Sequence, residues 1–298
     1  MNGIENPQTR TESPWTIGGL LDWTARYLAE KDSEYPRLDA EVLLAHALDC
    51  RRIDLYTRYE EPASESARSK FKELIRKRIE GYPVAYLVGR KEFFSLQFEV
   101  NGAVLIPRPE SEFVVLECLR LAKELAEPRV LDIGTGSGNI SVAIAHQNKQ
   151  ARVTAVDISP DALQVAARNA ARHSVSERVS FLPGDLFGPI QPTDRFDFIL
   201  SNPPYIAHED LERLPIGVRQ YEPRLALDGG PGGYAVFDRL VVDARQFLVP
   251  GGYLIVEIGA PQESHARARI LEEPGYELAD TIYDGSRHPR VLCARWQP

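Results

Sequence analysis

The chain has 298 residues, of which 43% are hydrophobic and 26% are charged, and its formal net charge at pH 7 is −8. This composition is ordinary for a globular protein with one or two domains. No apolar run approaches the roughly 20 residues that span a bilayer, and residues 1–13 lack an apolar signal-peptide core. We therefore expect a cytoplasmic protein without a membrane partner. Because the net charge is negative, we also expect no direct nucleic-acid binding over a broad surface.

The N-terminal part of the chain has the pattern of a tail followed by helices. Residues 1–14 are polar and predict a flexible tail. Apolar residues then recur at helical spacing after Thr16, Pro36 and Ser64. The third of these segments carries a basic face, which we interpret as solvent-exposed. The basic residues are Lys70, Lys72, Arg76, Lys77 and Arg78. These patterns predict a small helical domain over residues 15–81.

Residues 82–112 change period and predict a β-hairpin linker. Apolar residues approach strict alternation over residues 93–100, and Asn101-Gly102 is a strong signal for a hairpin turn. A turn with two prolines follows. Within this turn, Ser111 is placed to cap a helix predicted over residues 113–125.

From Arg129 onward, strands alternate with helices. The strands are predicted at residues 130–133, 153–157, 178–182, 196–200, 252–258, 276–283 and 290–296. The helices between them are predicted at residues 139–146, 159–172 and 234–248. Such alternation predicts an α/β fold with a doubly wound, mostly parallel sheet. The last two strands predict a closing hairpin, so we expect seven strands with one antiparallel edge strand, over a domain of residues 113–298.

A glycine-rich turn, residues 134–138, follows the first of these strands and allows the backbone to approach a ligand closely. Asn139 replaces the third glycine or alanine of the NAD fingerprint, and the chain has no Gly-Lys-Ser/Thr of a P-loop. Acidic residues follow the next two strands. Asp157 is placed to accept both hydroxyls of a ribose. Asp185 is placed to meet an adenine amino group, with Phe187 beside the ring.

The segment Ser201-Asn202-Pro203-Pro204-Tyr205 follows the fourth strand. The two prolines end sheet pairing there, so Asn202 and Tyr205 lie at the carboxyl end of a strand, where open α/β sheets bind ligands. The Asn202 side chain and the Pro203 carbonyl offer two acceptors for the protons of one planar NH2 group, on which Tyr205 can pack. Alone, the motif is equally consistent with a strand-ending turn. The upstream glycines and acids favour a binding site.

The three cysteines, Cys50, Cys118 and Cys293, lie far apart in the sequence. Their spacing matches neither a metal site nor a Cys-x-x-Cys motif. We therefore expect structural thiols and no metal.

The glycine-rich turn and the two acids resemble the cofactor pocket of class I methyltransferases. The resemblance implies S-adenosyl-L-methionine as cofactor and S-adenosyl-L-homocysteine as product. The cofactor-binding residues that it implies are Asp132, Ile133, Gly134, Thr135, Gly136, Asp157, Asp185, Phe187 and Asn202. Enzymes of this class that methylate planar nitrogens carry an Asn/Asp-Pro-Pro-Tyr/Phe motif. Two substrate classes share it, adenine N6 in DNA and the glutamine side-chain amide in proteins.

Longer segments resemble the HemK/PrmC family of release-factor glutamine N5-methyltransferases, from about residue 16 to the end of the chain. The matching segments are residues 81–89, 92–93, 105–110, 202–206, 222–230 and 284–291. The resemblance implies methylation of the glutamine in the Gly-Gly-Gln loop of bacterial class I peptide release factors, in support of translation termination. The helical domain would help to grip the release factor. Asn202, Pro203 and Tyr205 are implied to be catalytic, and these residues with Pro204 are implied to contact the substrate.

The sequence departs from the family pattern at two places. Ser111 stands where the family usually has Thr, and Pro231-Gly232-Gly233-Tyr234 replaces the usual Asp-Gly-Leu. A related enzyme that methylates a glutamine of a large-subunit ribosomal protein shares Asn-Pro-Pro-Tyr but departs from the Ile-Pro-Arg-Pro-Glu found here. For Arg108 and Glu110, an ion pair that fixes the turn is slightly favoured over direct substrate contact.

Two functions from other classes remain open at this point. A DNA adenine-N6 methyltransferase would need a basic cleft and a target-recognition region, which the net charge and length disfavour. A catalytically silent cofactor-binding module would not need Asn202 and Tyr205, yet both are present.

Overall fold

The computed structural model describes residues 15–31 and 33–298. The chain divides into two compact units, a helical unit that ends at Val88 and a larger unit, Gly89–Pro298. The expected tail, residues 1–14, lies outside the described residues. The division after Val88 differs from the expected boundary at residue 81, because the short helix α5 packs with the helices that precede it.

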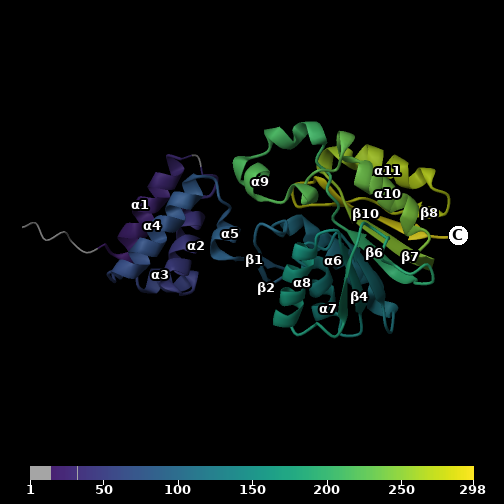
Figure 1. Ribbon diagram of the computed structural model, residues 1–298, viewed down its shortest axis with the longest axis horizontal. Helices are drawn as coiled ribbons and strands as arrows, with labels where there is room; N and C mark the ends of the chain where they lie inside the picture. Colours follow the sequence, from purple (N-terminus) through teal and green to yellow (C-terminus); the bar gives the residue numbers. More distant parts are fainter. Residues whose placement is uncertain (1–14, 32) are drawn as a thin grey trace, which may run out of the picture. The chain divides into compact units, whose positions relative to one another are not determined.

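The helical unit has its own apolar core (Figure 1). Its helices are α1 (Ile17–Ala29), α2 (Pro36–Leu48), α3 (Arg52–Thr57), α4 (Glu65–Ile79) and α5 (Val84–Val88). The three predicted helices are confirmed, and two of them begin with a side-chain cap. The Thr16 hydroxyl accepts from the Gly19 N–H at 3.0 Å, and the Ser64 hydroxyl accepts from the Ala67 N–H at 3.3 Å. The sequence analysis missed α3 and α5, which are too short to show a helical period.

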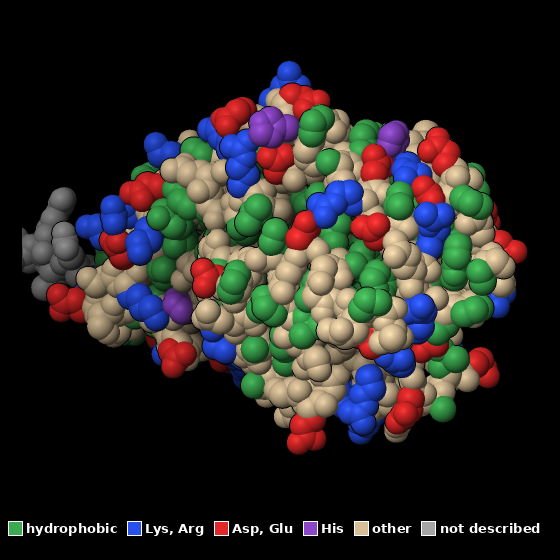
Figure 2. Space-filling model, turned by 45° about the vertical axis from the view of Figure 1, so that its right-hand side comes forward, with side chains coloured by type: hydrophobic (Ala, Val, Ile, Leu, Met, Phe, Trp, Pro, Cys, Tyr) green, Lys and Arg blue, Asp and Glu red, His purple; other side chains and the backbone are tan. Residues whose placement is uncertain are grey.

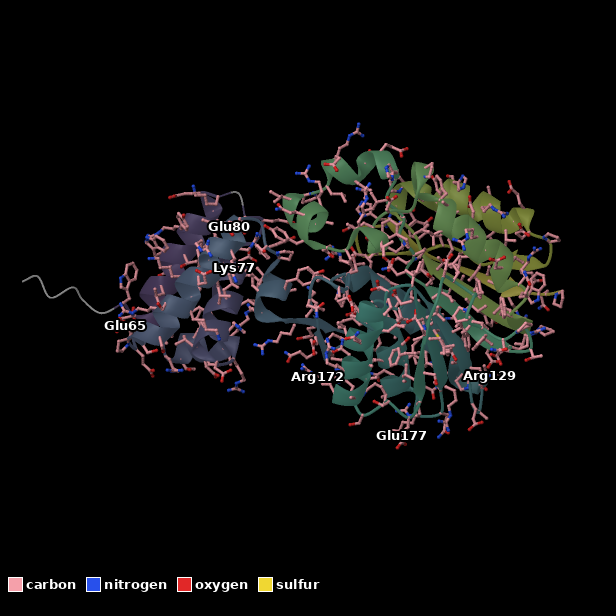
Figure 3. All side chains as sticks on the ribbon, in the orientation of Figure 1. Glu65, Lys77, Glu80, Arg129, Arg172 and Glu177 are labelled. Carbon is pink, nitrogen blue, oxygen red and sulfur yellow. The ribbon has the colours of Figure 1, made fainter. Side chains whose placement is uncertain are left out.

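Two of the five residues of the basic face of α4, Arg76 and Arg78, form ion pairs within the helical unit. Arg76 pairs with Glu73 and Glu80 on the same helix, and Arg78 pairs with Asp39 of α2 at 2.8 Å. Figure 3 labels Glu65 in the first turn of α4 and Lys77 in its last turn, an arrangement that favours the helix dipole. The pairing supports the interpretation of this face as a structural, solvent-exposed surface.

The β-hairpin has a different turn from the expected one. Strand β1 (Arg90–Phe93) pairs with β2 (Leu96–Glu99), so the turn is Phe94-Ser95, and the prediction of Asn101-Gly102 was wrong. Both turn residues have positive φ angles, 51° and 59°, which a two-residue turn between twisted strands requires. Asn101-Gly102 forms a separate turn after β2, in which the Asn101 side chain accepts from the Ala103 N–H.

The larger unit is built on an eight-stranded sheet with the order β5-β4-β3-β6-β7-β10-β8, and β9 also pairs with β10. The strands are β3 (Arg129–Ile133), β4 (Arg152–Asp157), β5 (Val179–Pro183), β6 (Phe196–Ser201), β7 (Leu248–Glu257), β8 (Tyr276–Leu278), β9 (Ile282–Tyr283) and β10 (Pro289–Trp296). The first five of these strands are parallel. The expected doubly wound, mostly parallel sheet is confirmed, with two differences in detail. First, the strand expected at residues 276–283 is split into β8 and β9, which form the edge of the sheet. Second, the antiparallel strand is not at the edge: it is β10, which pairs with β7 on one side and with β8 and β9 on the other.

Helices cover both faces of this sheet (Figure 1). One core joins the sheet to α6 (Glu112–Leu121), α7 (Asn139–Gln147) and α8 (Pro160–Arg172), and the other joins it to α10 (Ala235–Ala244) and α11 (Glu263–Glu272). Alternate strand residues supply the two cores, since Val130 and Phe198 face the first and Leu131 and Ile199 face the second. Helix α11 was not predicted.

The long insertion between β6 and α10 contains short helical turns. They are η3 (His208–Arg213), α9 (Ile216–Tyr221), η4 (Arg224–Ala226) and η5 (Pro231–Gly233). Backbone hydrogen bonds from Ile206 to Leu227 and from Gly229 to Ile206 tie this insertion to the end of β6.

The surface carries charges of both signs. In the view of Figure 2, Lys and Arg side chains are interspersed with Asp and Glu, without a broad basic area on that face. Among the described residues, no helix has the length and apolar character needed to cross a membrane.

Candidate active site

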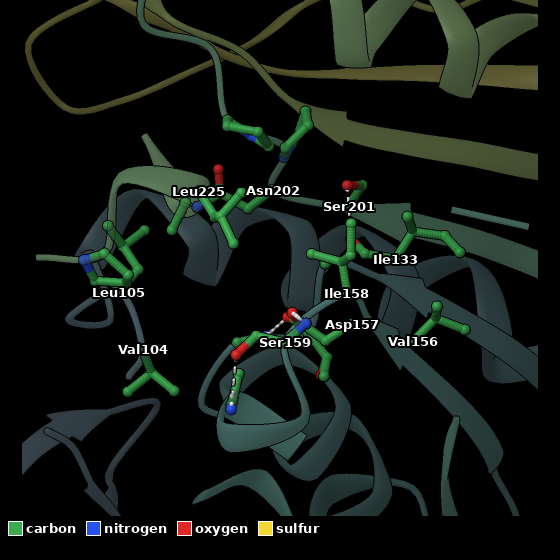
Figure 4. A pocket seen from close by; sticks show the side chains of 18 of the residues that line it. Val104, Leu105, Ile133, Val156, Asp157, Ile158, Ser159, Ser201, Asn202 and Leu225 are labelled. Carbon is green, nitrogen blue, oxygen red and sulfur yellow. Dashed lines mark hydrogen bonds between the residues drawn. The ribbon is translucent and has the colours of Figure 1, made fainter. Parts of the chain in front are cut away.

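A cavity of about 340 Å³ lies at the carboxyl ends of β3, β4 and β6 in the larger unit. The sheet order reverses between β3 and β6, and open α/β sheets bind ligands at such a point. Figure 4 shows Ile133, Asp157 and Asn202, which follow or end these strands, around the cavity. Its volume is sufficient for a small-molecule ligand.

The glycine-rich turn forms one wall of the cavity. The Gly134 and Thr135 N–H groups both donate to the Val156 carbonyl, at 2.8 and 3.0 Å, and this fixes the turn against β4. Gly136 has a φ of +55°, and an added Cβ would meet no atom within 4 Å, so its backbone faces open space. A ligand can therefore approach the main chain directly at Gly136.

Asp157 ends β4 on the cavity wall. One of its carboxylate oxygens accepts from the Gly136 N–H at 2.8 Å and the other from the Ser159 N–H at 2.9 Å. Burial raises the pKa of this carboxyl, while the backbone N–H groups of Ser159, Gly136 and Ile158 act in the opposite direction. Each oxygen keeps a further lone pair for a hydroxyl donor.

Asp132 lies behind the turn rather than on the cavity wall. It is fully buried, and its Oδ2 accepts from the hydroxyls of Thr135 at 2.7 Å and Ser141 at 2.5 Å. Its Oδ1 has no hydrogen-bond partner among the described residues. Burial raises the pKa of this carboxyl to about 6. The prediction placed Asp132 in contact with the cofactor, whereas the structure gives it the role of holding the turn.

After β5, Asp185 lies where the sequence predicted and Phe187 does not. Asp185 lines the cavity and accepts from Arg239 at 2.7 Å. Phe187 does not line it, because its ring is buried and stacks on Phe247 with a centroid distance of 5.0 Å. Leu186 occupies the wall in its place.

The Asn-Pro-Pro-Tyr segment contributes three of its four residues to the cavity wall, Asn202, Pro203 and Pro204. The Pro203 carbonyl receives no hydrogen bond from any described residue, so it remains free as an acceptor. Tyr205 does not line the cavity. Its ring packs against Gly259, and burial raises the pKa of its hydroxyl to about 12.

A hydrogen-bonded chain leads from Asn202 into the protein. The Asn202 side-chain NH2 donates to the Ser111 hydroxyl at 3.0 Å, and Ser111 donates to Glu257 Oε2 at 2.5 Å. Glu257 is 2% exposed, and burial raises its pKa to about 7. The prediction that Ser111 caps the following helix was wrong, because its hydroxyl makes no capping bond and is used in this chain.

Arg108 and Glu110 of the double-proline turn each form an ion pair with a residue outside the turn, rather than a single ion pair. Arg108 pairs with the buried Glu222 at 2.5 Å, and Glu222 also accepts from the Ile106 N–H. Glu110 lies 3.5 Å from Arg290. Glu222 and Glu257 were not predicted as site residues. The signal for Glu257 was a carboxylate within the apolar run of residues 252–258.

Residues 231–234, where the sequence differs from the family pattern, form a compact turn beside the Asn-Pro-Pro-Tyr segment. Gly233 has a φ of +83°, and an added Cβ would lie 2.3 Å from the Tyr205 carbonyl oxygen. Only glycine fits at this position without a shift of the backbone. The substitution is therefore accommodated by close packing of the two segments.

The residues that line the cavity offer groups suited to S-adenosylmethionine. Gly136 offers an open main chain, and Asp157 offers acceptors suited to a ribose. Ile158 and Leu225 line the cavity and are 55% and 67% exposed, so they offer apolar surface for a planar ring. The residues present therefore fit this cofactor.

Comparison with known proteins identifies the family. A model described as the PrmC N-terminal domain matches residues 19–89, and one described as a methyltransferase small domain matches residues 112–216. A release factor glutamine methyltransferase of Rhodopirellula baltica is 45% identical over 289 residues, which cover 96% of this chain and 98% of that protein. One of Geobacter sulfurreducens is 46% identical over 287 residues, with coverage of 96% and 99%. The chain belongs to the release factor glutamine methyltransferase family.

A solved structure supports the fold of this release factor glutamine methyltransferase family member. A methyltransferase from Pyrococcus furiosus superposes with a TM-score of 0.50 at 20% identity, over 69% of this chain and 91% of that one. The family membership and the methyltransferase domain establish an enzyme that uses S-adenosylmethionine as its methyl donor.

Proposed function

We propose that this enzyme methylates the side-chain amide nitrogen, N5, of the glutamine in the Gly-Gly-Gln motif of bacterial class I peptide release factors. The reaction would take place in the cytoplasm and support translation termination. The observation that carries the proposal is the pair of acceptors on the cavity wall, the Asn202 side chain and the unshared Pro203 carbonyl. Relatives of nearly the same length are named for this activity.

The two acceptors explain how a poor nucleophile is activated. An amide nitrogen shares its lone pair with the carbonyl group, so it must be oriented and polarised before it reacts. The Asn202 side-chain oxygen and the Pro203 carbonyl would each accept one N–H of the glutamine, which directs the nitrogen lone pair out of that plane. This positioning and local electrostatics supply the catalysis.

S-adenosylmethionine, when bound, supplies an electrophilic methyl group on a sulfonium that leaves as a neutral thioether. The glutamine nitrogen gains the methyl group and loses one proton to water, because no His or Lys lines the cavity among the described residues. We propose that Tyr205 packs on the glutamine once the substrate is bound. Its ring lies outside the cavity wall, next to the three residues of the motif that line it.

For the cofactor we propose contacts with residues of the cavity wall. They are Ile133, Gly134, Thr135, Gly136, Asp157, Asp185 and Asn202. Asp157 would hold the ribose, and Asp185 the adenine amino group. Asp132 and Phe187 would act indirectly, by supporting the glycine-rich turn and Leu186.

We further propose that the helical unit recognises the release factor. Among residues 15–31 and 33–298, those that line the cavity all belong to the larger unit, so the helical unit is free for a separate task. Its own apolar core supports folding independent of the cofactor site.

The function is tested by transfer of a labelled methyl group from S-adenosylmethionine to a purified release factor. The matched control is the same factor with Gln→Ala in its Gly-Gly-Gln loop. We expect label on the wild-type factor alone. Equal label on both factors would contradict the proposed site, and no label on either would direct the assay to ribosomal proteins and then to DNA.

A further inference from the structure

The side chains behind Asn202 show a fixed order of donors and acceptors. An ionised carboxylate can only accept hydrogen bonds, so the single proton of Ser111 must point to Glu257 at 2.5 Å. The oxygen of Ser111 can then only accept from Asn202, at 3.0 Å. The NH2 group of Asn202 must therefore face Ser111, and its carbonyl oxygen is the atom left for a ligand.

We propose that Ser111 and Glu257 are positioning residues that fix the orientation of the Asn202 amide, and that this orientation depends on an ionised Glu257. The proposal deepens the function above and rests on it, since the oriented oxygen is the one that would accept from the glutamine. The chain joins the turn before α6, the end of β7 and the residue after β6.

Burial restricts Ser111 and Glu257 to hydrogen-bond partners within the protein. Ser111 is 1% exposed and Glu257 is 2% exposed, so water does not compete for either group. Ser111 and Asn202 line the cavity, whereas Glu257 does not. Glu257 therefore acts on the substrate only through the serine, and an amide side chain without such a partner could rotate and present its NH2 group instead.

Protonation of Glu257 would reverse the order of donors. A neutral carboxyl can donate to Ser111, and the serine can then donate to the Asn202 oxygen and remove it from the substrate. The charged and titratable groups around Glu257 are Glu110, Arg290, Arg108 and Tyr205. Burial and, to a smaller extent, Glu110 raise the pKa of Glu257 to about 7, whereas the hydrogen bond from Ser111 and the two arginines lower it. We therefore expect turnover to rise as the pH increases through about 7.

The test compares the turnover of four variants of the full-length enzyme with that of the wild type. Ser111→Ala removes the acceptor, and kcat should fall roughly tenfold to a hundredfold with little change in cofactor affinity. Ser111→Thr keeps the hydroxyl and should restore most of the loss. Glu257→Gln keeps an oxygen for Ser111 but cannot titrate, so its kcat should lose the pH dependence near 7. Glu273→Gln, a half-buried carboxylate paired with Arg245 and Arg269 outside the cavity, should keep the wild-type profile.

A second measurement does not depend on activity. With asparagine labelled by nitrogen-15, the side-chain NH2 resonances of Asn202, assigned by their loss in Asn202→Ala, should shift with pH in the wild type and not in Glu257→Gln. Unchanged kcat in Ser111→Ala, or the same NMR titration in both proteins, would overturn the proposal. A wild type that methylates no release factor but shows the NMR difference would reject the proposed function while retaining the oriented amide.

Discussion

At the scale of single residues, the carboxyl ends of three strands place the chemical groups of the site. The sequence predicted Asn202, Asp157 and Asp185 at the cavity, because proline-terminated or acidic strand ends have a fixed place in a parallel sheet. It did not predict that Phe187 turns into the core or that Ser111 binds Glu257. Those contacts join segments far apart in the chain, and local pattern does not encode them.

Asp157 gives a prediction at this scale. Asp157→Ala removes the acceptor proposed for the ribose and also frees the Gly136 and Ser159 N–H groups. Hydrogen bonds to charged groups are worth about 1.5–3 kcal/mol, so the Kd for S-adenosylmethionine should rise roughly tenfold to a hundredfold. Calorimetry measures the change. Asp161→Ala, an exposed acid on α8, is the control, and equal affinities of the two variants would exclude Asp157 from the cofactor site.

Glu257 gives a second prediction, on stability. Its pKa is 4.5 in the unfolded chain and about 7 in the fold, so the neutral form stabilises the fold below pH 4.5. This contribution is lost as the pH rises through the window from about 4.5 to 7, by up to about 1.4 kcal/mol per pH unit. The free energy of unfolding of Glu257→Gln should therefore rise relative to that of the wild type as the pH increases through this window.

Urea unfolding at a series of pH values, followed by circular dichroism, measures this difference. A constant difference between the two proteins from pH 4.5 to 7 would show that Glu257 does not titrate abnormally in the fold. The result also bears on function, because the ionised form proposed for catalysis is the less stable one, as strained or desolvated site groups often are.

At the scale of elements, the starts of two helices and the parallel strands were predicted correctly, whereas the turn of the β-hairpin was predicted at the wrong residues. Thr16 and Ser64 cap the helices that were predicted to begin after them. The hairpin places its turn at Phe94-Ser95, against local preference, because this register puts Phe93 and Phe98 on one face, where both are buried in the core. Core burial thus outweighs the turn preference of Asn101-Gly102.

The cap of α4 supplies the prediction at this scale. Ser64→Ala removes the acceptor for the Ala67 N–H and should lower the free energy of unfolding by about 1 kcal/mol. Ser69→Ala, at an exposed position inside the same helix, should raise it by a few tenths of a kcal/mol, since Ala is the better helix former. Denaturant unfolding of both variants checks the opposite signs, and a loss of equal size in each would contradict the capping role.

At the scale of the whole molecule, the two units divide the proposed tasks. The alternation of strands and helices was enough to predict the catalytic fold, because it allows few topologies. The unit boundary was missed by several residues, since the short helix α5 depends on packing with α2 and α4 rather than on its own sequence. The relevant cut for experiments is after Val88.

Removal of residues 1–88 should separate cofactor binding from substrate recognition. The remaining unit contains both cores around the sheet and every residue that lines the cavity. Its Kd for S-adenosylmethionine should stay close to that of the full chain, while the KM for the release factor rises at least tenfold. An unchanged KM would contradict the proposed role of the helical unit.

The most direct test of the account is to map the methyl group on a release factor treated with the wild type and with Asn202→Ala. Peptide mass spectrometry would locate the modification, and calorimetry would verify that both proteins bind S-adenosylmethionine. We predict one methyl group on the amide nitrogen of the Gly-Gly-Gln glutamine with the wild type, and a rate at least a hundredfold lower with Asn202→Ala. Equal rates for the two proteins, or a methyl group on any other residue, would contradict the central role of Asn202.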